Sequence, residues 1–245
     1  MSSPKQEQQP PLSTLKPIYP PPPSTPIDPN TQPEQQPSIH STITALNLIP
    51  HIEGGYFNET DRSPLNIPNP FLSDPNLSYT APENATTRLA PGQDNSTRSA
   101  STTIYYYLTP TTPLGAFHRN RGRTVHTLHW GRGRYVLIHA DEVMSPEGKV
   151  VEGKKARIET FVVGKDIAKG ERVQWIVEGG KYKASYLLPD QEGVEEKKTE
   201  GLLISETVVP GFEFADHDFM LPETMHELLT PEQVDELKWM LRKGA

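Results

Sequence analysis

Residues 99–140 read SASTTIYYYLTPTTPLGAFHRNRGRTVHTLHWGRGRYVLIHA, and this stretch decides the fold. It contains four short runs rich in β-branched and aromatic residues, separated by Gly and Pro: 99–108, 114–120, 124–130 and 134–140. Such runs predict strands, and the lack of a helical pattern between them predicts antiparallel rather than parallel pairing. The stretch therefore predicts an antiparallel sandwich or closed barrel.

The same pattern continues toward the C-terminus, with further strand-like runs at 156–164, 172–179, 182–188 and 202–214. Helical patterns flank this region. A short one runs from Thr42 to Leu48, and a second follows Thr230-Pro231-Glu232-Gln233, which has the form of a capping box with Pro at the first helical position. We predict an all-β barrel with a short N-terminal helix and a C-terminal helix.

Two segments differ in composition from the rest. Twelve of the 26 prolines precede His40, and no glycine occurs before Gly54. Such a segment buries too little apolar surface to offset the entropy of ordering, so we expect a disordered Pro/Gln-rich tail over 1–40. The domain is expected over 41–245, with residues 64–97, rich in Pro, Asn, Ser and Thr, as a surface insertion.

Composition also excludes several classes of protein. The chain has no cysteine, which excludes disulfides and thiolate chemistry and is typical of a reducing compartment such as the cytoplasm or nucleus. No early basic and apolar stretch predicts a secretory signal, and no apolar run approaches ~20 residues. The formal net charge of −7 argues against nucleic acid. We expect no nucleic-acid or membrane partner.

A metal-binding motif is present in spacing only. Metal-dependent cupins, which are barrels of the double-stranded β-helix type, place ligands as H-x-H-x(3,4)-E-x(6)-G, with a last His on a later strand. Here His118, Asn120 and Thr124 stand at the first three positions and Lys183 at the last. An ammonium repels a cation, so we expect no metal and no other cofactor. An alternative metal site could use His126 together with His118. It would have only two imidazoles, and metals need at least three protein donors.

The same side chains predict a small-molecule site. Side chains alternate between the two faces of a strand, so Thr124 and His126 share an inward face. Together with Asn120, His118 and Lys183, they are expected to bind a polar or anionic molecule such as a carboxylate, phosphate or sugar derivative. His118 is the candidate base and Lys183 the oxyanion partner. The competing interpretation is a satisfied core histidine and a lysine that extends to the rim.

A family resemblance rests on four motifs in order: HIEGGYFNETDRS (51–63), FHRNRGRTVHTLHWGRGRYVLIHADE (117–142), QWIVEGGKYKASYLLP (174–189) and VVPGFEFADHDF (208–219). Together they resemble the DUF985, or cupin-5, family, above all its fungal branch, over about residues 41–245 without the insertion. The resemblance implies a cupin jelly roll like that of RmlC-type proteins and a homodimer. It implies no particular activity.

The resemblance also implies pocket residues. Its matching positions add Glu53, Tyr56, Glu59 and Arg62 from the first motif, and Arg119, Gln174, Phe212, Phe214 and Asp216 from the later ones. Bacterial members carry S-D-E-x-W-H-F where this chain has GRTVHTL, so no acid–base role passes to Thr124. The expected ligand-binding residues are Glu53, Tyr56, Arg62, His118, Arg119, Asn120, Thr124, His126, Gln174, Lys183, Phe214 and Asp216.

Three functions stay open from the sequence. The first is a metal-independent module that binds a small metabolite. The second is an epimerase or isomerase, by likeness to sugar-epimerase cupins, in which His118 removes a proton beside a carbonyl and Tyr106 or Tyr186 is the opposite acid. The third, a metal-dependent oxygenase, lacks most of its ligands.

The segment 99–108 also bears on assembly. It contains Tyr105, Tyr106 and Tyr107 in a row and is apolar on both faces. A strand covered on both sides predicts packing against a second barrel, and hence a homodimer.

Overall fold

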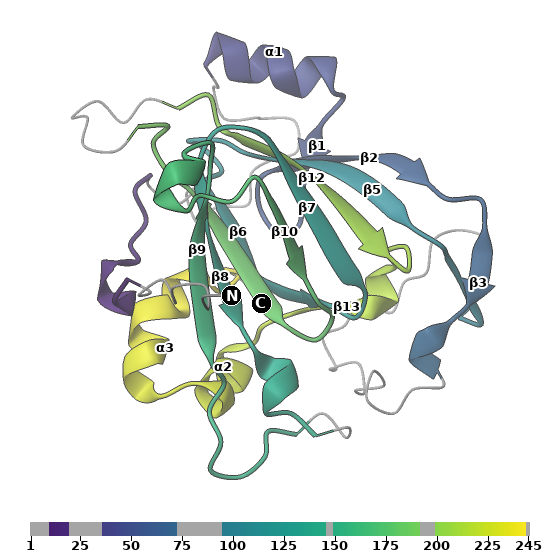
Figure 1. The fold of residues 1–245 in the computed structure, drawn as a ribbon, viewed down its shortest axis with the longest axis vertical. Coiled ribbons are helices and arrows are strands. Elements are labelled where there is room, and N and C mark those ends of the chain that lie inside the picture. Colours follow the sequence, from purple (N-terminus) through teal and green to yellow (C-terminus); the bar gives the residue numbers. More distant parts are fainter. Residues whose placement is uncertain (1–9, 20–35, 73–94, 146–148, 192–198, 244–245) are drawn as a thin grey trace, which may run out of the picture.

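Two antiparallel sheets face each other and enclose the core (Figure 1). Among the described residues, the first sheet has six strands in the order β1 (Ile49–Pro50), β2 (Tyr56–Arg62), β5 (Thr102–Leu108), β12 (Leu202–Val209), β7 (Arg123–Trp130) and β10 (Gln174–Val177). The second has five, in the order β13 (His217–Phe219), β6 (Leu114–Asn120), β11 (Tyr182–Leu187), β8 (Gly133–Ile138) and β9 (Ile158–Val163). A short pair, β3 (Asn66–Pro68) with β4 (Thr97–Ser99), lies beside them.

This computed structural model describes residues 10–19, 36–72, 95–145, 149–191 and 199–243. Most of the expected tail, residues 1–9 and 20–35, and most of the expected insertion, residues 73–94, lie outside the described residues. Within the tail, Leu15 is 1% exposed and belongs to the core cluster that also holds Val136, Met225 and Leu237. Among the described residues, no helix has the length and hydropathy that a bilayer crossing requires.

The structure has strands in the predicted regions, and some of them end at other residues than predicted. β6 has the predicted bounds, and on β7 the inward Thr124 and His126 are buried, whereas Val125 and Thr127 are half-buried. The strand predicted over 202–214 is β12, and it stops at Val209 because Pro210 has no N–H to donate to a neighbouring strand. The chain then turns into a short 3₁₀ helix, η5 (Phe214–Asp216), before β13.

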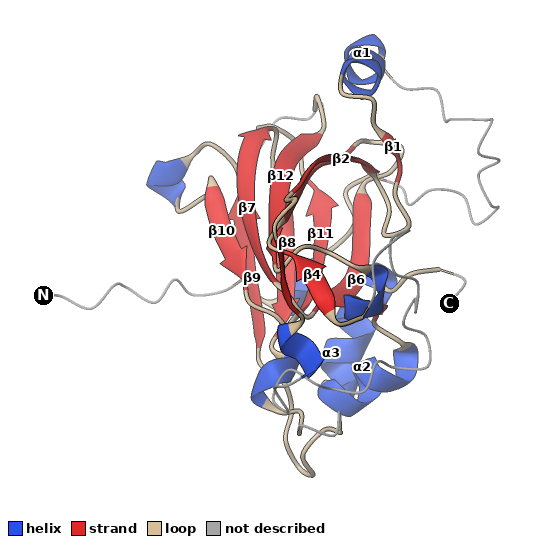
Figure 2. Ribbon diagram, turned by 90° about the vertical axis from the view of Figure 1, so that its right-hand side faces the viewer, coloured by secondary structure: helices blue, strands red, loops and turns tan. Residues whose placement is uncertain are grey.

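Helices cover the outside of the barrel (Figure 2). The N-terminal helix α1 (Pro37–Ala45) begins earlier than expected, with Pro37 in its first turn, and ends before Asn47, whose φ is 52°. At the C-terminus, α3 (Pro231–Leu237) has the predicted Thr230–Gln233 capping box. The helix before it, α2 (Pro222–Leu228), was not predicted. Both C-terminal helices pack on the second sheet through Met225, Leu228, Val234 and Leu237.

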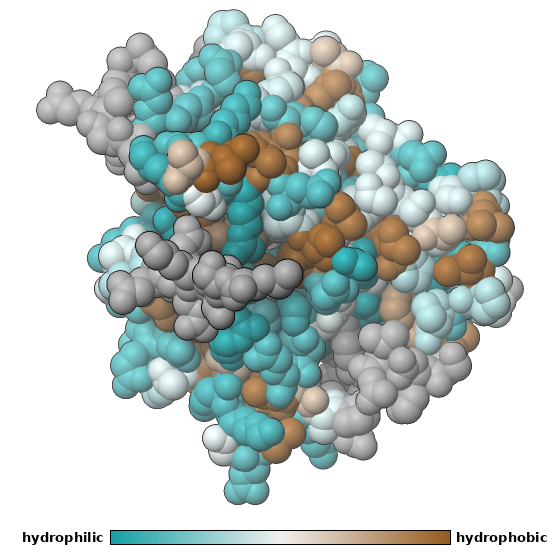
Figure 3. All heavy atoms as spheres, viewed as in Figure 1, coloured by the Kyte–Doolittle hydropathy of each residue, from teal (hydrophilic) through white to brown (hydrophobic). Residues whose placement is uncertain are grey.

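The apolar strand β5 has both faces covered within one chain. Tyr106 and Leu108 belong to the cluster inside the barrel, whereas Tyr107 packs outward with Ile39 and Ile43 of α1. A second copy is therefore not needed to cover this strand, and the homodimer stays a prediction. Elsewhere on the surface, apolar residues form several groups among polar ones (Figure 3).

Candidate functional site

A cavity of about 310 Å³ opens into the barrel. The first sheet supplies one side of it through β2, β5 and β12, and β6 of the second sheet supplies another. The turn before β2 and the segment after β12 complete the wall. The lining residues are His51, Glu53, Phe57, Glu59, Arg62, Thr102, Ile104, His118, Asn120, Glu206, Val208, Phe212, Glu213 and Phe214.

Three side chains of types that can ligate a metal meet beside this cavity: Glu53 and His118, which line it, and His217. Glu53 Oε2 lies 3.3 Å from Nε2 of His118, and Glu53 Oε1 lies 3.0 Å from Nε2 of His217. The two imidazole rings stack with their centroids 5.4 Å apart. Three segments distant in the sequence thus bring two histidines to the two oxygens of one carboxylate.

The turn that carries Glu53 is held tightly against the barrel. Gly54 has a φ of 106°, and a Cβ there would lie 2.0 Å from the carbonyl oxygen of Leu114, so no other residue fits. The Glu53 carbonyl accepts from the Ala116 amide at 2.8 Å. The Tyr106 hydroxyl donates to the Gly54 carbonyl at 2.8 Å. The carboxylate is therefore fixed in position before any ligand arrives.

The protonation of His118 follows from its other ring nitrogen. Its Nδ1 lies 2.9 Å from the Ala116 carbonyl, which can only accept, so the proton is on Nδ1 and Nε2 carries a lone pair. Burial lowers the pKa of His118 to about 3, Lys183 acts in the same direction, and Glu53 opposes it. Burial acts to raise the pKa of Glu53, but His118 and His51 hold it well below its ordinary value. At neutral pH, Glu53 is a carboxylate that faces Nε2 of His118.

The apolar part of the cavity wall consists of Phe57, Ile104, Val208, Phe212 and Phe214, and the last two rings meet edge to face with centroids 5.1 Å apart. Polar and charged residues line the remainder, and one of their atoms has no partner. Oδ1 of Asn120 is buried and has no hydrogen-bond partner among the described residues. An unpaired buried acceptor is costly, so this atom favours a ligand that donates a hydrogen bond.

Lys183 does not present a free positive charge to the cavity. Its Nζ lies 2.6 Å from Glu206 Oε2 and 3.0 Å from His126 Nε2, and its side chain is 4% exposed. Burial acts to raise the pKa of Glu206, but Lys183 and His126 hold it well below its ordinary value. Burial, followed by Lys183, lowers the pKa of His126. The charges of Lys183 and Glu206 cancel within the cluster that they form with His126. Of the three, Glu206 lines the cavity.

This pairing removes the basis for expecting an anionic ligand. That expectation required an unpaired Lys183, and the sequence did not show that Glu206 lies beside it. Arg62, the cationic side chain among the lining residues, is likewise bound, to Glu59 at 2.9 Å and to Glu213 at 2.8 Å. The lining carboxylates are Glu53, Glu59, Glu206 and Glu213. Acceptors and negative charge dominate this cavity.

Several expected ligand-binding residues lie elsewhere. Arg119 points to the opposite face of β6 from His118 and pairs with Asp218, Nε to Oδ1, at 2.8 Å. Asp216 accepts from buried Arg98 at 2.5 Å. Both carboxylates hold the C-terminal segment on the barrel, and neither Arg119 nor Asp216 lines the cavity.

The remaining expected residues divide in a similar way. Tyr56 packs beneath α1 with Ile39, and Gln174 is exposed on the edge strand β10. Thr124 is buried inside the barrel between Val177 and Val208 but does not line the cavity. The expected residues that line the cavity are Glu53, Arg62, His118, Asn120 and Phe214, while His126 and Lys183 form the neighbouring cluster.

The positions at which metal-dependent cupins hold an ion do not fit one here. Of the four residues, His118 alone has a side chain of the type that transition metals prefer, and Lys183 places an ammonium at the fourth position. The structure nevertheless brings His217 beside Glu53 and His118, and sequence reasoning missed this third donor. His217 stands in the motif FADHDF, next to Asp216, and this position is the one sign of it in the sequence.

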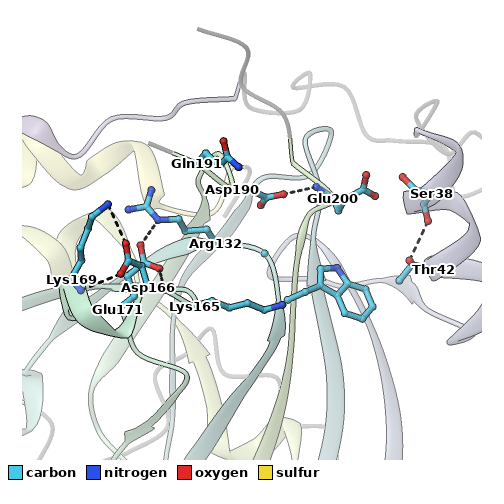
Figure 4. A pocket seen from close by; sticks show the side chains of 12 residues that line it. Ser38, Thr42, Arg132, Lys165, Asp166, Lys169, Glu171, Asp190, Gln191 and Glu200 are labelled. Atoms are coloured by element: carbon cyan, nitrogen blue, oxygen red, sulfur yellow. Dashed lines mark hydrogen bonds and ion pairs between the residues drawn. The ribbon is translucent and has the colours of Figure 1, made fainter. Parts of the chain in front are cut away.

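A larger and more open hollow of about 910 Å³ lies near α1, between the β7–β8 turn and the loop that precedes β10 (Figure 4). Four of its charged groups form two ion pairs: Arg132 with Glu171 at 2.5 Å, and Lys169 with Asp166 at 3.1 Å. The hollow is broad and lacks the buried imidazoles of the barrel cavity. The barrel cavity is therefore the candidate site.

Comparison with known proteins agrees with this architecture. The model of the family described as Cupin superfamily (DUF985) matches residues 40–220. The uncharacterized protein YML079W of Saccharomyces cerevisiae is 41% identical over 212 residues, which cover 85% of this chain and 88% of the yeast protein. The resemblance and the cupin jelly-roll fold expected from the sequence are both confirmed.

Two solved structures are similar in fold. A hypothetical protein from Leishmania major has a TM-score of 0.58 and 24% identity, covering 82% of this chain and 97% of its own. Protein SO0799 from Shewanella oneidensis has a TM-score of 0.52 and 20% identity, covering 80% and 94%. At these identities the likeness concerns the fold alone.

Proposed function

Because the chain belongs to the DUF985 family of the cupin superfamily, we propose that its barrel binds a small organic molecule in the cavity beside Glu53 and His118. One observation carries the proposal. The cavity combines apolar walls with buried polar groups gathered at one end, which is the usual construction of a small-molecule site, and its volume of about 310 Å³ suits a metabolite.

The chemistry of the wall favours a ligand that donates hydrogen bonds. The buried polar end offers the carboxylate of Glu53, Nε2 of His118 and the unpaired Oδ1 of Asn120, all of them acceptors. Hydroxyl or amino groups satisfy such atoms, whereas a carboxylate or phosphate meets the charge of Glu53 and Glu206. The ligand class that fits is a neutral or cationic molecule with hydroxyl or amino groups and an apolar part that packs on Phe212 and Phe214.

A thermal-shift screen with matched pairs, each an alcohol and its phosphate ester, tests this proposal. Wild type should be stabilised by uncharged members and not by their phosphates. Ile104→Trp fills the cavity from β5 and should abolish the shift, whereas Ile167→Trp, at a position 66% exposed and remote from the cavity, should retain it. A shift that survives in Ile104→Trp, or one produced mainly by phosphates, contradicts the proposal.

Proton transfer is a second candidate, and the tautomer of His118 favours it. With Nδ1–H donated to Ala116, Nε2 is available as a base toward a bound carbonyl compound. An epimerase also needs an acid on the opposite face of the ligand. No tyrosine lines the cavity among the described residues, Tyr106 donates to the Gly54 carbonyl, and Tyr186 packs against Trp239. An epimerase here needs the ligand or a water to supply that proton.

Deuterium exchange distinguishes catalysis from binding alone. A carbonyl compound that binds in the screen is incubated with the protein in D₂O, and the signal of the proton next to its carbonyl is followed by NMR. Proton transfer predicts loss of that signal with wild type, and no loss above background with His118→Gln, which still binds. Equal exchange by both proteins removes His118 as the base.

A further inference from the structure

Nε2 of His118 and the carboxylate of Glu53 face each other as two hydrogen-bond acceptors, which is unfavourable. The Ala116 carbonyl fixes the proton of His118 on Nδ1, so Nε2 faces Glu53 Oε2 at 3.3 Å as one acceptor facing another. Neither atom satisfies the other, and the two side chains are only 7% and 10% exposed. A positive species is needed between them.

The spacing of the three donors fits a metal ion better than a proton alone. Two ligands that each lie about 2.1 Å from one ion, at tetrahedral or octahedral angles, are separated by about 3.0 to 3.4 Å. The observed separations from Glu53 are 3.3 Å to His118 and 3.0 Å to His217, and all three donor atoms lie within 4.8 Å of one another. Little movement is required to bring them onto one centre.

The surroundings also resemble those of metal ligands. A histidine that binds metal through Nε2 commonly donates Nδ1–H to a backbone carbonyl, as His118 does to Ala116. The carboxylate is fixed by its turn, and His217 comes from β13, which pairs with β6 next to His118. Two imidazoles and one carboxylate are a set that divalent transition metals accept, with further coordination positions left open.

We infer that Glu53, His118 and His217 bind one divalent transition-metal ion at the polar end of the cavity. The site shares only His118 with the four positions that metal-dependent cupins use. Its other two ligands come from the turn before β2 and from β13, so it is a different site. It deepens the proposed function and rests on it only for the ion's role, which is to offer open positions to the hydroxyl or amino group of the ligand. With the ion bound, His118 is a ligand and not a base.

Titration of the tag-free, full-length chain with Co²⁺ after dialysis against a chelator tests the inference. One equivalent should give d–d absorption bands, Zn²⁺ should displace it, and Mg²⁺ should not, since it prefers oxygen ligands. Glu53→Gln and His217→Gln should each weaken Co²⁺ binding by at least tenfold. His139→Gln is the matched control, because His139 also lies 3.2 Å from two carboxylates, but Arg157 already provides the positive charge there.

The outcomes separate the two proposals. Two results overturn the metal site. The first is a wild type that shows no absorption bands and binds no Zn²⁺, and the second is a Co²⁺ affinity that is the same in Glu53→Gln and His217→Gln as in the control His139→Gln. Ligand shifts that persist in chelator leave the small-molecule proposal standing in that case. If the variants fail to fold, wild-type crystals soaked in Co²⁺ decide the matter: an anomalous peak within bonding distance of both Nε2 atoms supports the site, and its absence at full soak overturns it.

Discussion

Lys183 on β11 and Glu206 on β12 form a buried ion pair of 2.6 Å that joins the two sheets across the inside of the barrel. The pair gives the lysine that stands where other cupins place a histidine a counter-charge inside the barrel. His126 completes the cluster and stacks on Trp175 with ring centroids 5.0 Å apart. Glu206 is one of four carboxylates that line the cavity, together with Glu53, Glu59 and Glu213.

Breaking this pair from one side should cost far more than removing it. Glu206→Gln leaves a buried ammonium without its counter-charge, and we expect a loss of about 3–5 kcal/mol in the free energy of unfolding. The double variant Lys183→Met/Glu206→Gln should recover a large part of that loss. Urea denaturation of both variants measures it, and additive losses in the double variant would show that the two charges do not interact.

Acidification should destabilise the protein as the pH falls below about 6.5. The lowered pKa of His126 keeps it neutral when folded, so the unfolded chain binds the extra proton and stability drops toward the folded pKa. Each such proton changes the free energy of unfolding by about 1.4 kcal/mol per pH unit. His126→Gln should reduce this slope by one proton, and Thr127→Ser, on the other face of β7, should not. An unchanged slope in His126→Gln contradicts the assignment.

Asp216 should matter for stability and not for binding. It accepts from Arg98, and both side chains are buried, so Asp216→Asn leaves a buried guanidinium and should lower stability by several kcal/mol. Ligands found in the screen should still bind the folded variant with unchanged affinity. Isothermal titration of ligand into Asp216→Asn at low temperature checks this, and a lost affinity would return Asp216 to the site.

Tyr106 should act on the site through the turn that carries Glu53. Tyr106→Phe removes a buried hydrogen bond to the Gly54 carbonyl, which should cost about 1 kcal/mol of stability and loosen the carboxylate. We expect weaker ligand binding although no lining residue changes. Tyr186→Phe, on the far side beside Trp239, is the control and should leave affinity intact. Equal affinities for wild type and Tyr106→Phe would show that the turn needs no such support.

The homodimer expected from the sequence remains to be measured. Since α1 covers the outer face of β5, we expect the contact on the edge strand β10 instead, where Ile176 is 45% exposed. Light scattering should give twice the chain mass of 27.4 kDa for wild type and the single mass for Ile176→Lys. A monomeric wild type removes the prediction.

The fold could be predicted largely because Gly and Pro separate the strands. Residues 114–120 and 182–187 fall in single strands since their alternation and their boundaries agree. The helix α2 was missed because PETMHEL has few residues in which a period can appear. Its position also depends on packing against the barrel, which the sequence does not state.

The site was only half predictable, for a related reason. His118 stands in a motif with known spacing, and Asn120 follows from alternation. Glu53 and His217 are 164 residues apart, and nothing local indicates that one turn and one short strand converge on His118. The pairing of Lys183 with Glu206 depends equally on which strands of the two sheets face each other. The sequence therefore does not show the charge neutralisation across the barrel, on which we base the proposal of a hydrogen-bond donor as ligand.

The most direct test is an electron-density map of the cavity at high resolution, from full-length protein crystallised without chelator and then soaked with the ligands selected in the screen. We expect non-protein density whose polar end lies beside Glu53, His118 and Asn120, and whose body packs on Phe212 and Phe214. A cavity that contains only water in every such map, with ligand bound instead in the hollow beside Arg132, would contradict it.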